Sequence, residues 1–520
     1  MSPTTLSSVA SFSVIALAAY CLFRSFWENR RTRLLPFPPG PRFIPLLGNV
    51  HQLPVDFPYL QFRKWGQMFG DVFFLKVFRR PTLVINSVHV AKELLAHRGA
   101  KYSDRFPSHL ITVMGLEVST PFIGYGDTWR RHRKLMQVGF GDQGALARLR
   151  PVQQREIVGL LSRLSQDPDA FDSHIKHFAT ALTVSVAYGK TEDETIFRYA
   201  ETILHTVVTV LAARTAVLLD LLPFSKYVPS WVLCGLFSAG LLKTRPLVIH
   251  FMDSAYEDAR TAAALGKDKA SFVAIATEAQ TLKSDTNSDS DIKNALLSGF
   301  PTKITVQFLI TLNTFLVQMV AHQDVYAKAQ RSIDEVVGKE RLPDLSDRDS
   351  LPYVDAILKE VYRLVINPPL PMSIPRRLMD DDEYRGYHIP KGTSVIANIW
   401  QMGRDSRYYK DPDTFNPDRF IDPTPGFLVE PDPRGYVFSF GRRMCPGQRF
   451  GDDTIWWTIA SIIATFNVKK ALDADGKEIT PSLTVLPGLT SHVQQFPCSI
   501  QPRAQQALEL IAETAIRLLE

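Results

Sequence analysis

The chain of 520 residues carries 59 Lys and Arg against 53 Asp and Glu, and 45% of its residues are hydrophobic. A large buried core is therefore expected, and a net charge of +6 is too small for this length to indicate nucleic-acid binding. It favours an acidic protein partner or anionic lipid, with scattered solvated charge as the alternative. Cys21, Cys234, Cys445 and Cys498 contain no Cys-x-x-Cys pair, which excludes a disulfide framework and fits a reducing compartment.

Residues 6–23 form an uncharged, apolar stretch that is just long enough to cross a bilayer as a helix. It is followed by a cluster of arginines: Arg24, Arg30, Arg31 and Arg33. The positive-inside rule then predicts a cytosolic location for the rest of the chain. A cleaved signal peptide is the alternative, but no positive charge precedes the apolar stretch. We expect a membrane anchor over 1–23 and a basic, proline-rich linker over 24–41.

Two runs rich in aromatic and β-branched residues, 71–77 and 81–85, predict a β-hairpin. A helix over 88–98 follows, and a long loop then begins at Tyr102 and runs towards Tyr125.

A basic helix is predicted to begin at Asp127, which is a plausible N-cap. Trp129 and Arg133 are four residues apart and share one face, so that the indole N–H and the guanidinium can both donate to one carboxylate. The other cationic side chains are expected to point outwards: Arg130, Arg131 and Lys134. They suit an acidic protein partner, and a solvated helix face is the alternative.

Residues 152–263 are mostly helical by their periodicity, and 204–239 are unusually apolar. This stretch is not a second membrane span, because it is interrupted by charged residues and prolines such as Arg214 and Pro223. A long helix is predicted over 292–337, with a kink at Pro301.

Glu360 and Arg363 are three residues apart on a predicted helix, where an ion pair forms readily. Arg376 and Arg377 begin a strand, and a strand, a turn and a strand follow over 387–398. A proline-rich, irregular segment then leads to Arg419.

Residues 438–447 read Phe-Ser-Phe-Gly-Arg-Arg-Met-Cys-Pro-Gly. The thiolate of Cys445 is a soft, strongly donating ligand that suits iron, and nearby cations keep it charged. Gly441 and Gly447 lack a Cβ, so the backbone can turn sharply and lie close to a flat cofactor. After this loop we predict a helix over 451–468, strand-like sequence over 478–502, and an amphipathic helix over 504–520.

The complete Phe-x-x-Gly-x-Arg-x-Cys-x-Gly pattern resembles the haem-binding loop of the cytochrome P450 family, and essentially the whole chain is similar to its fungal microsomal members. The resemblance implies a mainly α fold with a small β region, a haem-thiolate domain over 42–503 and a helical extension over 504–520. Heme b would be held by Cys445 as axial ligand, with Phe438 beneath the loop and Gly447 beside the cofactor. Further cofactor contacts are implied for Trp129, Arg133, Arg105, Arg376 and Arg443. Glu360, Arg363 and Arg419 would form a structural triad behind the loop.

The resemblance also implies an activity and its partners. A cytochrome P450 of this kind inserts one atom of O2 into an apolar substrate, here terpenoid, steroid-like or aromatic. No dinucleotide or flavin motif is present, so electrons must come from another protein, which is NADPH–cytochrome P450 reductase, with cytochrome b5 as an optional second donor. NADPH would thus act only indirectly. The predicted location is the endoplasmic reticulum membrane, with one span and a cytosolic catalytic domain.

The sequence departs from the family in its long helix, which normally carries a Gly-x-Asp/Glu-Thr run that delivers protons during oxygen activation. Residues 303–308 stand at that place, and no Asp or Glu occurs between Asp291 and Asp324. Ordered water with Thr302, Thr305 or Gln307 could relay protons instead. Alternatively, the chain is a haem-thiolate isomerase or dehydratase that does not use O2, or a haem-binding protein with impaired oxygen activation.

A gene-model error at an intron edge is a further alternative. Residues 364–367 form a second departure, because the segment is about two residues longer than is usual for the family.

Overall fold

The computed structural model describes residues 35–54, 56–189, 196–203, 206, 240–283, 288–297, 303–364, 371–421, 431–482, 485–486 and 492–518. Three predicted features lie outside these residues, wholly or almost wholly: the anchor over 6–23, the apolar stretch 204–239, and the kink at Pro301 with the neighbouring Thr302. The lengthened segment 364–367 also lies outside them after Leu364.

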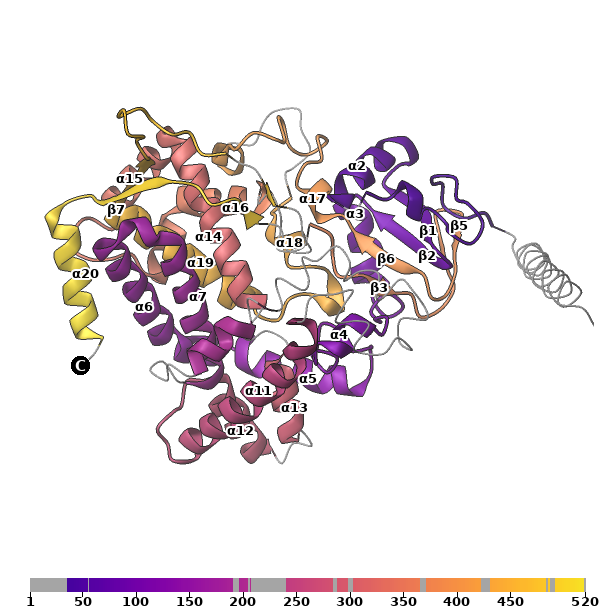
Figure 1. Cartoon of the computed structure of the whole chain (residues 1–520), viewed down its shortest axis with the longest axis horizontal. Coiled ribbons are helices and arrows are strands. Elements are labelled where there is room, and N and C mark those ends of the chain that lie inside the picture. The colour runs from indigo at the N-terminus through magenta and orange to yellow at the C-terminus, as the bar shows by residue number, and fades with distance from the viewer. Residues whose placement is uncertain are drawn as a thin grey trace, which may run out of the picture.

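The described chain is mainly helical (Figure 1). Its α-helices are α2 (Pro58–Phe69), α3 (Val88–Ala91), α4 (His109–Val113), α5 (Asp127–Phe140), α6 (Gln143–Gln166), α7 (Phe171–Tyr188), α11 (Gly240–Ala264), α12 (Phe272–Lys283), α13 (Asp289–Leu296), α14 (Lys303–Ala321), α15 (Gln323–Val336), α16 (Pro352–Leu364), α17 (Ile399–Met402), α18 (Arg434–Val437), α19 (Gln448–Thr465) and α20 (Gln505–Arg517). The shorter helical turns are η1 (Val50–Gln52), η2 (Lys92–His97), η3 (Pro168–Ala170), η5 (Leu345–Ser350), η6 (Pro417–Phe420) and η7 (Gly441–Arg443).

The main sheet has four strands in the order β1 (Val72–Val77), β2 (Arg80–Ile85), β6 (Ser394–Ala397) and β3 (Arg376–Arg377). The predicted hairpin is confirmed, with β1 antiparallel to β2, whereas β6 runs parallel to β2. Among the described residues, three further antiparallel pairs form: β4 (Asp382–Tyr384) with β5 (Tyr387–Ile389), β7 (Phe466–Lys470) with β10 (Cys498–Pro502), and β8 (Val485–Leu486) with β9 (His492–Val493).

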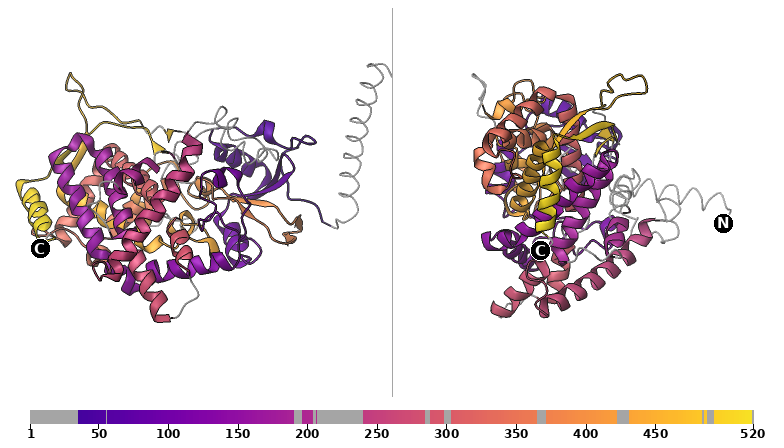
Figure 2. Two further views of the ribbon diagram at one scale, coloured as in Figure 1. Left: turned by 60° about the horizontal axis from the view of Figure 1, so that its bottom comes forward. Right: turned by 90° about the vertical axis from the view of Figure 1, so that its left-hand side faces the viewer.

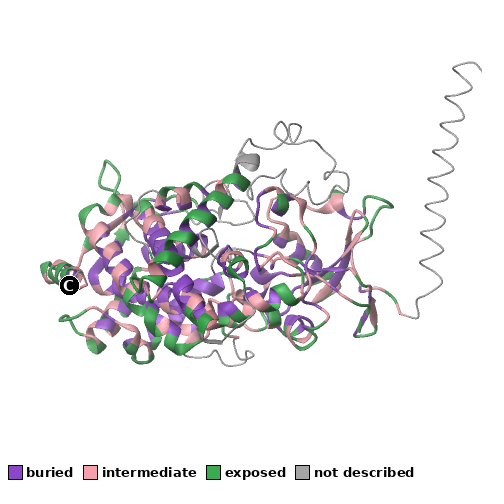
Figure 3. Ribbon diagram, turned by 90° about the horizontal axis from the view of Figure 1, so that it is seen from below, coloured by how far each residue is buried: buried purple, intermediate pink, exposed green. Residues whose placement is uncertain are grey.

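The sheet, with α2 beside it, and α20 lie at opposite ends of the molecule, and most of the other long helices lie between them (Figure 1 and Figure 2). Buried residues concentrate on the inward faces of these helices and along the strands (Figure 3). In α14, Leu312, Phe315 and Leu316 are fully buried in the largest hydrophobic cluster. The same cluster contains Trp456 and Ile459 of α19, the helix that follows the cysteine loop, whereas Tyr436 of α18, which precedes the loop, belongs to a second cluster.

Several predicted boundaries are wrong. The helix predicted over 292–337 is divided, because α14 ends at Ala321 and α15 leaves it at 106°. The helix predicted over 451–468 begins and ends earlier, as α19, since the chain is already extended at Phe466 and pairs there with β10. Within the described part of 478–502, only three short strands form.

Asp127 is not an N-cap. The N-cap of α5 is Gly126, and Asp127 lies in the first turn, where its carboxylate pairs with Arg130. A first-turn carboxylate still stabilises a helix through the positive end of the helix dipole.

In the described part of the chain, no single helix is long and apolar enough to cross a membrane. The bent pair Thr305–Ala321 and Gln323–Val336 meets that test only when its two helices are taken together.

Candidate active site

The cysteine loop, residues 438–447, connects α18 to α19. The backbone N–H of Cys445 donates to the carbonyl oxygen of Phe438 at 2.9 Å, which closes the loop, and the cysteine side chain is half-buried. Gly441 has a φ of +53°, and a Cβ there would lie 2.4 Å from the carbonyl oxygen of Leu95. Gly441 is thus required by close packing on η2. A Cβ at Gly447 would meet no atom within 4 Å, so this side of the loop is open to a flat group.

Two sources of positive charge lie near Cys445. Gly447 is the N-cap of α19, so the loop delivers the cysteine to the positive end of that helix. Arg133 lies close enough to Cys445 for their charges to interact, and it donates to the carbonyl oxygen of Met444 at 2.7 Å. Both effects favour the thiolate that a soft metal ion binds.

Arg443 and Arg105 are buried and point into the surrounding backbone. Arg443 donates to the carbonyl oxygens of Ser103 (2.8 Å), Thr120 (2.9 Å) and Ile123 (2.9 Å). Arg105 donates to three other carbonyl oxygens, those of Pro121, Ile374 and Pro375. The loop predicted to begin at Tyr102 thus accepts hydrogen bonds from both arginines through its backbone carbonyl oxygens.

Arg376, on β3, is almost fully buried beside the same loop. It donates to the carbonyl oxygens of Leu95 (3.1 Å) and Phe440 (2.7 Å) and to the hydroxyl of Ser439 (3.1 Å). Its Nε is buried and has no hydrogen-bond partner among the residues that the structure describes.

The buried ring of Trp129 lies against two of these arginines. The guanidinium of Arg443 is 4.8 Å from the ring centroid and that of Arg133 is 5.8 Å away. Cation–π attraction of this kind holds the α5 face and the cysteine loop together. The helical spacing that placed Trp129 and Arg133 on one face is confirmed.

These arginines carry positive charge that the described residues do not neutralise. Burial, followed by repulsion from Arg443, lowers the pKa of Arg376 to about 9, and burial lowers the pKa of Arg443 to about 10. Burial lowers the pKa of Arg105 too, and both neighbouring arginines add repulsion. Asp104 attracts Arg105 and Arg443, but its own ion pair is with Arg377 at 3.6 Å.

Buried cations without a paired anion are costly, so this arrangement indicates an anionic ligand. A ligand with two carboxylates beside a metal that takes thiolate fits both the arginines and the unpartnered Nε of Arg376. Heme b has these features. A protein that binds haem through one cysteine in this way is a haem-thiolate protein.

Comparison with known proteins leads to the same class. The sequence profile of the cytochrome P450 family matches residues 38–493. Cytochrome P450 monooxygenase 136 of Postia placenta is 39% identical over 98% of this chain and 97% of its own length. A cytochrome P450 monooxygenase of Armillaria gallica is 35% identical over 96% of this chain and 99% of its own length. The chain therefore belongs to the cytochrome P450 family and is a monooxygenase by class.

Two further comparisons are more distant. Tryptamine 4-monooxygenase of Psilocybe cyanescens is 29% identical over 96% of this chain and 99% of its own length. A solved zebrafish cytochrome P450 with abiraterone covers 86% of this chain and 100% of its own, with a TM-score of 0.69 at 21% identity. The second comparison confirms the predicted mainly helical P450 fold, and the fungal relatives agree with the predicted similarity to fungal members.

The residues predicted as a structural triad meet in the structure. Glu360 and Arg363 lie on α16, and Arg419 lies on η6. Both arginines donate to the Glu360 carboxylate, and all three side chains are buried. Arg363 also donates to carbonyl oxygens of the irregular segment that precedes η6: Gly403, Pro412 and Thr414. Phe438 packs edge-on against Tyr362, the neighbour of Arg363, with ring centroids 5.6 Å apart.

Thr305 and Gln307 are not brought together. The hydroxyl of Thr305 is fully buried and donates to the hydroxyl of Thr183 on α7 at 3.2 Å. Gln307 is half-buried and lies two residues further along α14, which rotates it by about 200° to the other side of the helix. The structure thus directs Thr305 towards the helical core.

Arg131 was expected to point outwards but forms an ion pair across helices. Its Nε lies 3.0 Å from the Asp291 carboxylate on α13, whereas Arg130 and Lys134 are exposed. Sequence reasoning also missed the charged residues on either side of the cysteine loop, Arg434 and Asp452. Their closeness to the cysteine motif in the sequence was the one signal that could have indicated a role. Charged side chains are common on exposed surfaces, so the burial of these two residues could not be inferred.

Proposed function

We propose that the protein is a membrane-bound haem-thiolate monooxygenase that inserts one atom of O2 into an apolar organic substrate. The observation that carries the proposal is the convergence of Arg105, Arg133, Arg376 and Arg443 on the loop of Cys445, without paired carboxylates in the described chain. Heme b bound there supplies the electron-transfer and oxygen-activating chemistry.

The chain's own residues would bind and orient that group. Cys445 would hold the haem iron through its thiolate, and the positive end of α19 would keep its sulfur anionic. Arg376, Arg443 and Arg105 would donate to the haem carboxylates, with Arg133 and the Trp129 indole on the α5 side. Burial of these groups removes competing water and so strengthens each of their charge-assisted hydrogen bonds.

The substrate would be terpenoid, steroid-like or aromatic. The support is the apolar composition of residues 204–239 in the sequence and of α14 in the structure. The apolar stretch 6–23 and the arginines that follow it support a single-span anchor in the endoplasmic reticulum membrane with a cytosolic catalytic domain.

Electrons would come from NADPH through NADPH–cytochrome P450 reductase, with cytochrome b5 as an optional second donor. Arg130, Lys134 and Arg442 support this, because they are exposed on or beside α5 and the cysteine loop. If an acidic partner binds these basic side chains, its affinity should fall as the salt concentration rises.

The test is co-expression with a fungal reductase, followed by the reduced carbon monoxide difference spectrum and an NADPH-dependent screen of the three substrate classes. We expect a thiolate-type Soret band and oxidised product from at least one class. A haem spectrum without that band would overturn the assignment of Cys445, and a thiolate band without any oxidised product would favour the second candidate.

A second candidate function is a haem-thiolate isomerase or dehydratase that does not use O2, or a haem-binding protein with impaired oxygen activation. One observation favours it: no acid occurs between Asp291 and Asp324, and the hydroxyl of Thr305 is bonded to Thr183 on α7. An isomerase or dehydratase would convert its substrate without reductase or oxygen, whereas the impaired protein would consume NADPH and release peroxide or superoxide.

A further inference from the structure

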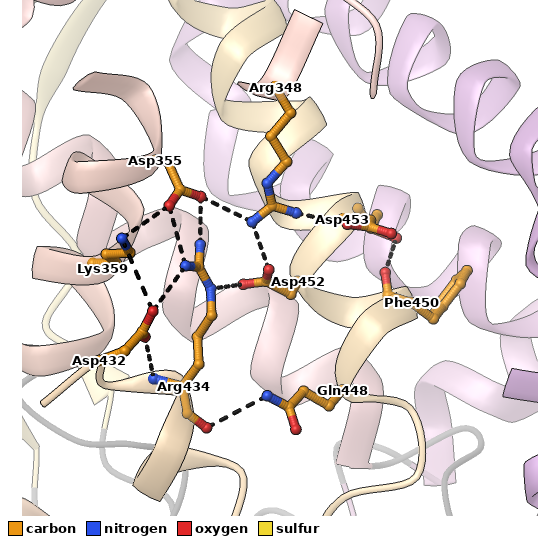
Figure 4. A network of polar contacts seen from close by, with 10 residues as sticks. Arg348, Asp355, Lys359, Asp432, Arg434, Gln448, Phe450, Asp452 and Asp453 are labelled. Atoms are coloured by element: carbon orange, nitrogen blue, oxygen red, sulfur yellow. Dashed lines mark hydrogen bonds and ion pairs between the residues drawn. The ribbon is translucent and has the colours of Figure 1, made fainter. Parts of the chain in front are cut away.

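A network of charged side chains joins the two ends of the cysteine loop to α16 (Figure 4). We call it the loop-end network, and its members are Arg348, Asp355, Lys359, Asp432, Arg434, Asp452 and Asp453. It is separate from the Glu360 triad, which binds a different segment of the chain.

Arg434 connects three elements. It is the first residue of α18, just before the loop, and its Nε lies 2.8 Å from Oδ1 of Asp452 on α19, just after the loop. Its Nη1 lies 3.1 Å from Oδ2 of Asp355 on α16, and its Nη2 contacts Oδ1 of the same carboxylate. One planar guanidinium therefore holds the start of the loop, the end of the loop and α16 in fixed relative positions.

Arg348, from η5, reinforces the same contacts. It donates to Asp355 at 2.9 Å, to Asp453 at 2.6 Å and to Asp452. The side chains of Arg348 and Arg434 are each only 17% exposed, so solvent screens these pairs weakly. Burial alone would raise the pKa of Asp355, but the hydrogen bond and charge of Arg434, together with Arg348, lower it to about 2.

Two contacts lead from this network to the cysteine. Tyr362 lies on α16, the helix that carries Asp355, and it is buried with a hydroxyl that has no hydrogen-bond partner among the described residues. Its ring packs against Phe438, whose carbonyl oxygen accepts the backbone N–H of Cys445 at 2.9 Å. A change in the separation of the loop ends would therefore reach the backbone of Cys445 through Tyr362 and Phe438.

A weaker contact also joins the loop ends: Nε2 of Gln448 donates to the carbonyl oxygen of Arg434 at 3.4 Å, which is long for a hydrogen bond (Figure 4). The arginines bind only the middle of the loop to neighbouring elements. Arg443 donates from the loop, whereas Arg376 and Arg133 donate to carbonyl oxygens of the loop. The Arg434–Asp452 pair, in contrast, bridges the loop from one end to the other.

We propose that Arg434 is a positioning residue for Cys445. By binding Asp452 and Asp355 it sets the separation of the loop ends, and so sets where the sulfur lies and how well the thiolate–metal bond is maintained. The inference rests on the proposed function, because it concerns the bond between Cys445 and haem iron.

The test compares Arg434→Gln and Arg434→Lys with Arg503→Gln in the full-length holoprotein. Arg503 is a matched control, because it forms a bidentate pair with Asp334 (2.8 and 2.6 Å) that has no contact with the loop. The share of the reduced carbon monoxide complex in the thiolate form is measured against pH. Hydrogen–deuterium exchange of residues 438–447 is measured on the same proteins.

We expect Arg434→Gln to lower the thiolate share several-fold and to shift its conversion to the thiol form towards higher pH. Loop exchange should become about tenfold faster, as expected when a charge-assisted hydrogen bond is lost. Arg434→Lys keeps the positive charge but loses the planar guanidinium, so it should show the same changes to a smaller extent. It also keeps the inference testable if the Arg434→Gln protein does not fold. Arg503→Gln should leave both readouts unchanged.

Unchanged thiolate share and loop exchange in both Arg434 variants would overturn the inference. So would a lower melting temperature alone, because that is what a merely structural pair would give. If the wild type itself lacks the thiolate band, the proposed function fails. In that case, loop exchange unchanged by Arg434→Gln would also overturn the positional role, and faster exchange confined to 438–447 would support it.

Discussion

Nε and Nη2 of Arg363 each lie 2.7 Å from a different carboxylate oxygen of Glu360, in a pair that is shielded from solvent. The same carboxylate accepts the Nε of Arg419 at 3.2 Å and the backbone N–H of Asn416 at 2.8 Å. A buried carboxylate with this many donors is satisfied only while every partner stays in place.

Glu360→Ala should therefore cause loss of fold and haem, not merely of turnover. It leaves Arg363 and Arg419 buried without their anion, which costs roughly 3–5 kcal/mol. Soluble yield, haem content and thermal unfolding measure the effect. The control is Glu278→Ala, which removes an exposed pair with Arg148 and should cost less than about 1 kcal/mol. A soluble, haem-replete Glu360→Ala protein would show that the triad is dispensable.

Arg376→Gln should release haem faster than the wild type, by about tenfold or more. The change removes a buried guanidinium whose Nε has no partner in the described chain and is therefore available to a haem carboxylate. Each charge-assisted hydrogen bond of this kind would contribute about 1.5–3 kcal/mol to holding the haem. Transfer of haem to apomyoglobin measures the rate. The neighbouring Arg377→Gln is the matched control, because its side chain is 39% exposed. Equal rates for the two variants would rule out Arg376 as a haem contact.

Cys445→Ser should abolish the thiolate-type band, whereas Cys498→Ser should retain it. Cys498 lies on β10, and burial raises its pKa to about 12, so it stays protonated at neutral pH and is a poor ligand. The reduced carbon monoxide difference spectrum decides between them. A thiolate band in the Cys445→Ser protein would mean that another residue binds the iron.

Thr305→Val should not change the product formed per NADPH consumed, because the hydroxyl it removes is bonded to Thr183 and lies in the helical core. A stability loss of about 1 kcal/mol is the expected consequence. Gln307→Leu alters the other side of α14, and we expect it to lower that ratio and to increase peroxide release. Reversed behaviour of the two variants would return the proton-relay role to Thr305.

Acidification should weaken the loop-end network at Asp355. Its pKa is about 2 in the folded protein and 3.8 for an ordinary Asp, so the unfolded chain binds more protons between these values. Stability from this group is complete above about pH 4 and falls by about 2 kcal/mol as the pH falls through 2. Asp355→Asn should show a shallower loss of stability in this window, measured by urea unfolding.

Asp475→Asn, on an exposed turn, is the control for that experiment. Identical pH dependence in wild-type and Asp355→Asn protein would mean that the carboxylate makes no net contribution there.

Features that depend on short spacings could be predicted from the sequence. Trp129 and Arg133 share a face because a helix brings residues four apart together, and the hairpin of β1 and β2 follows from two adjacent strand patterns. Asp127 shows the limit of such reasoning. Its residue type suits a cap, but the helix begins one residue earlier than that role requires, and the carboxylate pairs with Arg130 instead.

Long-range pairings could not be predicted in the same way. Arg348 and Asp453 are separated by 105 residues, and Arg131 reaches Asp291 across 160. Nothing in the local pattern distinguishes these side chains from solvated charges. The bend between α14 and α15 was missed because both helices have continuous helical composition.

The sequence by itself determined the cysteine loop with Arg442 and Arg443 in it, and the Glu360–Arg363 pair, since each depends on residue type at short spacing. Arg105, Arg133 and Arg376 were expected beside the loop only because the whole chain resembles the cytochrome P450 family. Only the tertiary structure decided which charges are buried without a partner, that Thr305 faces Thr183, and that Arg434 joins the ends of the loop. The physical reason is desolvation. The free-energy cost of a charge depends on whether distant segments of the chain exclude water from it and supply a partner. Only folding brings those segments together.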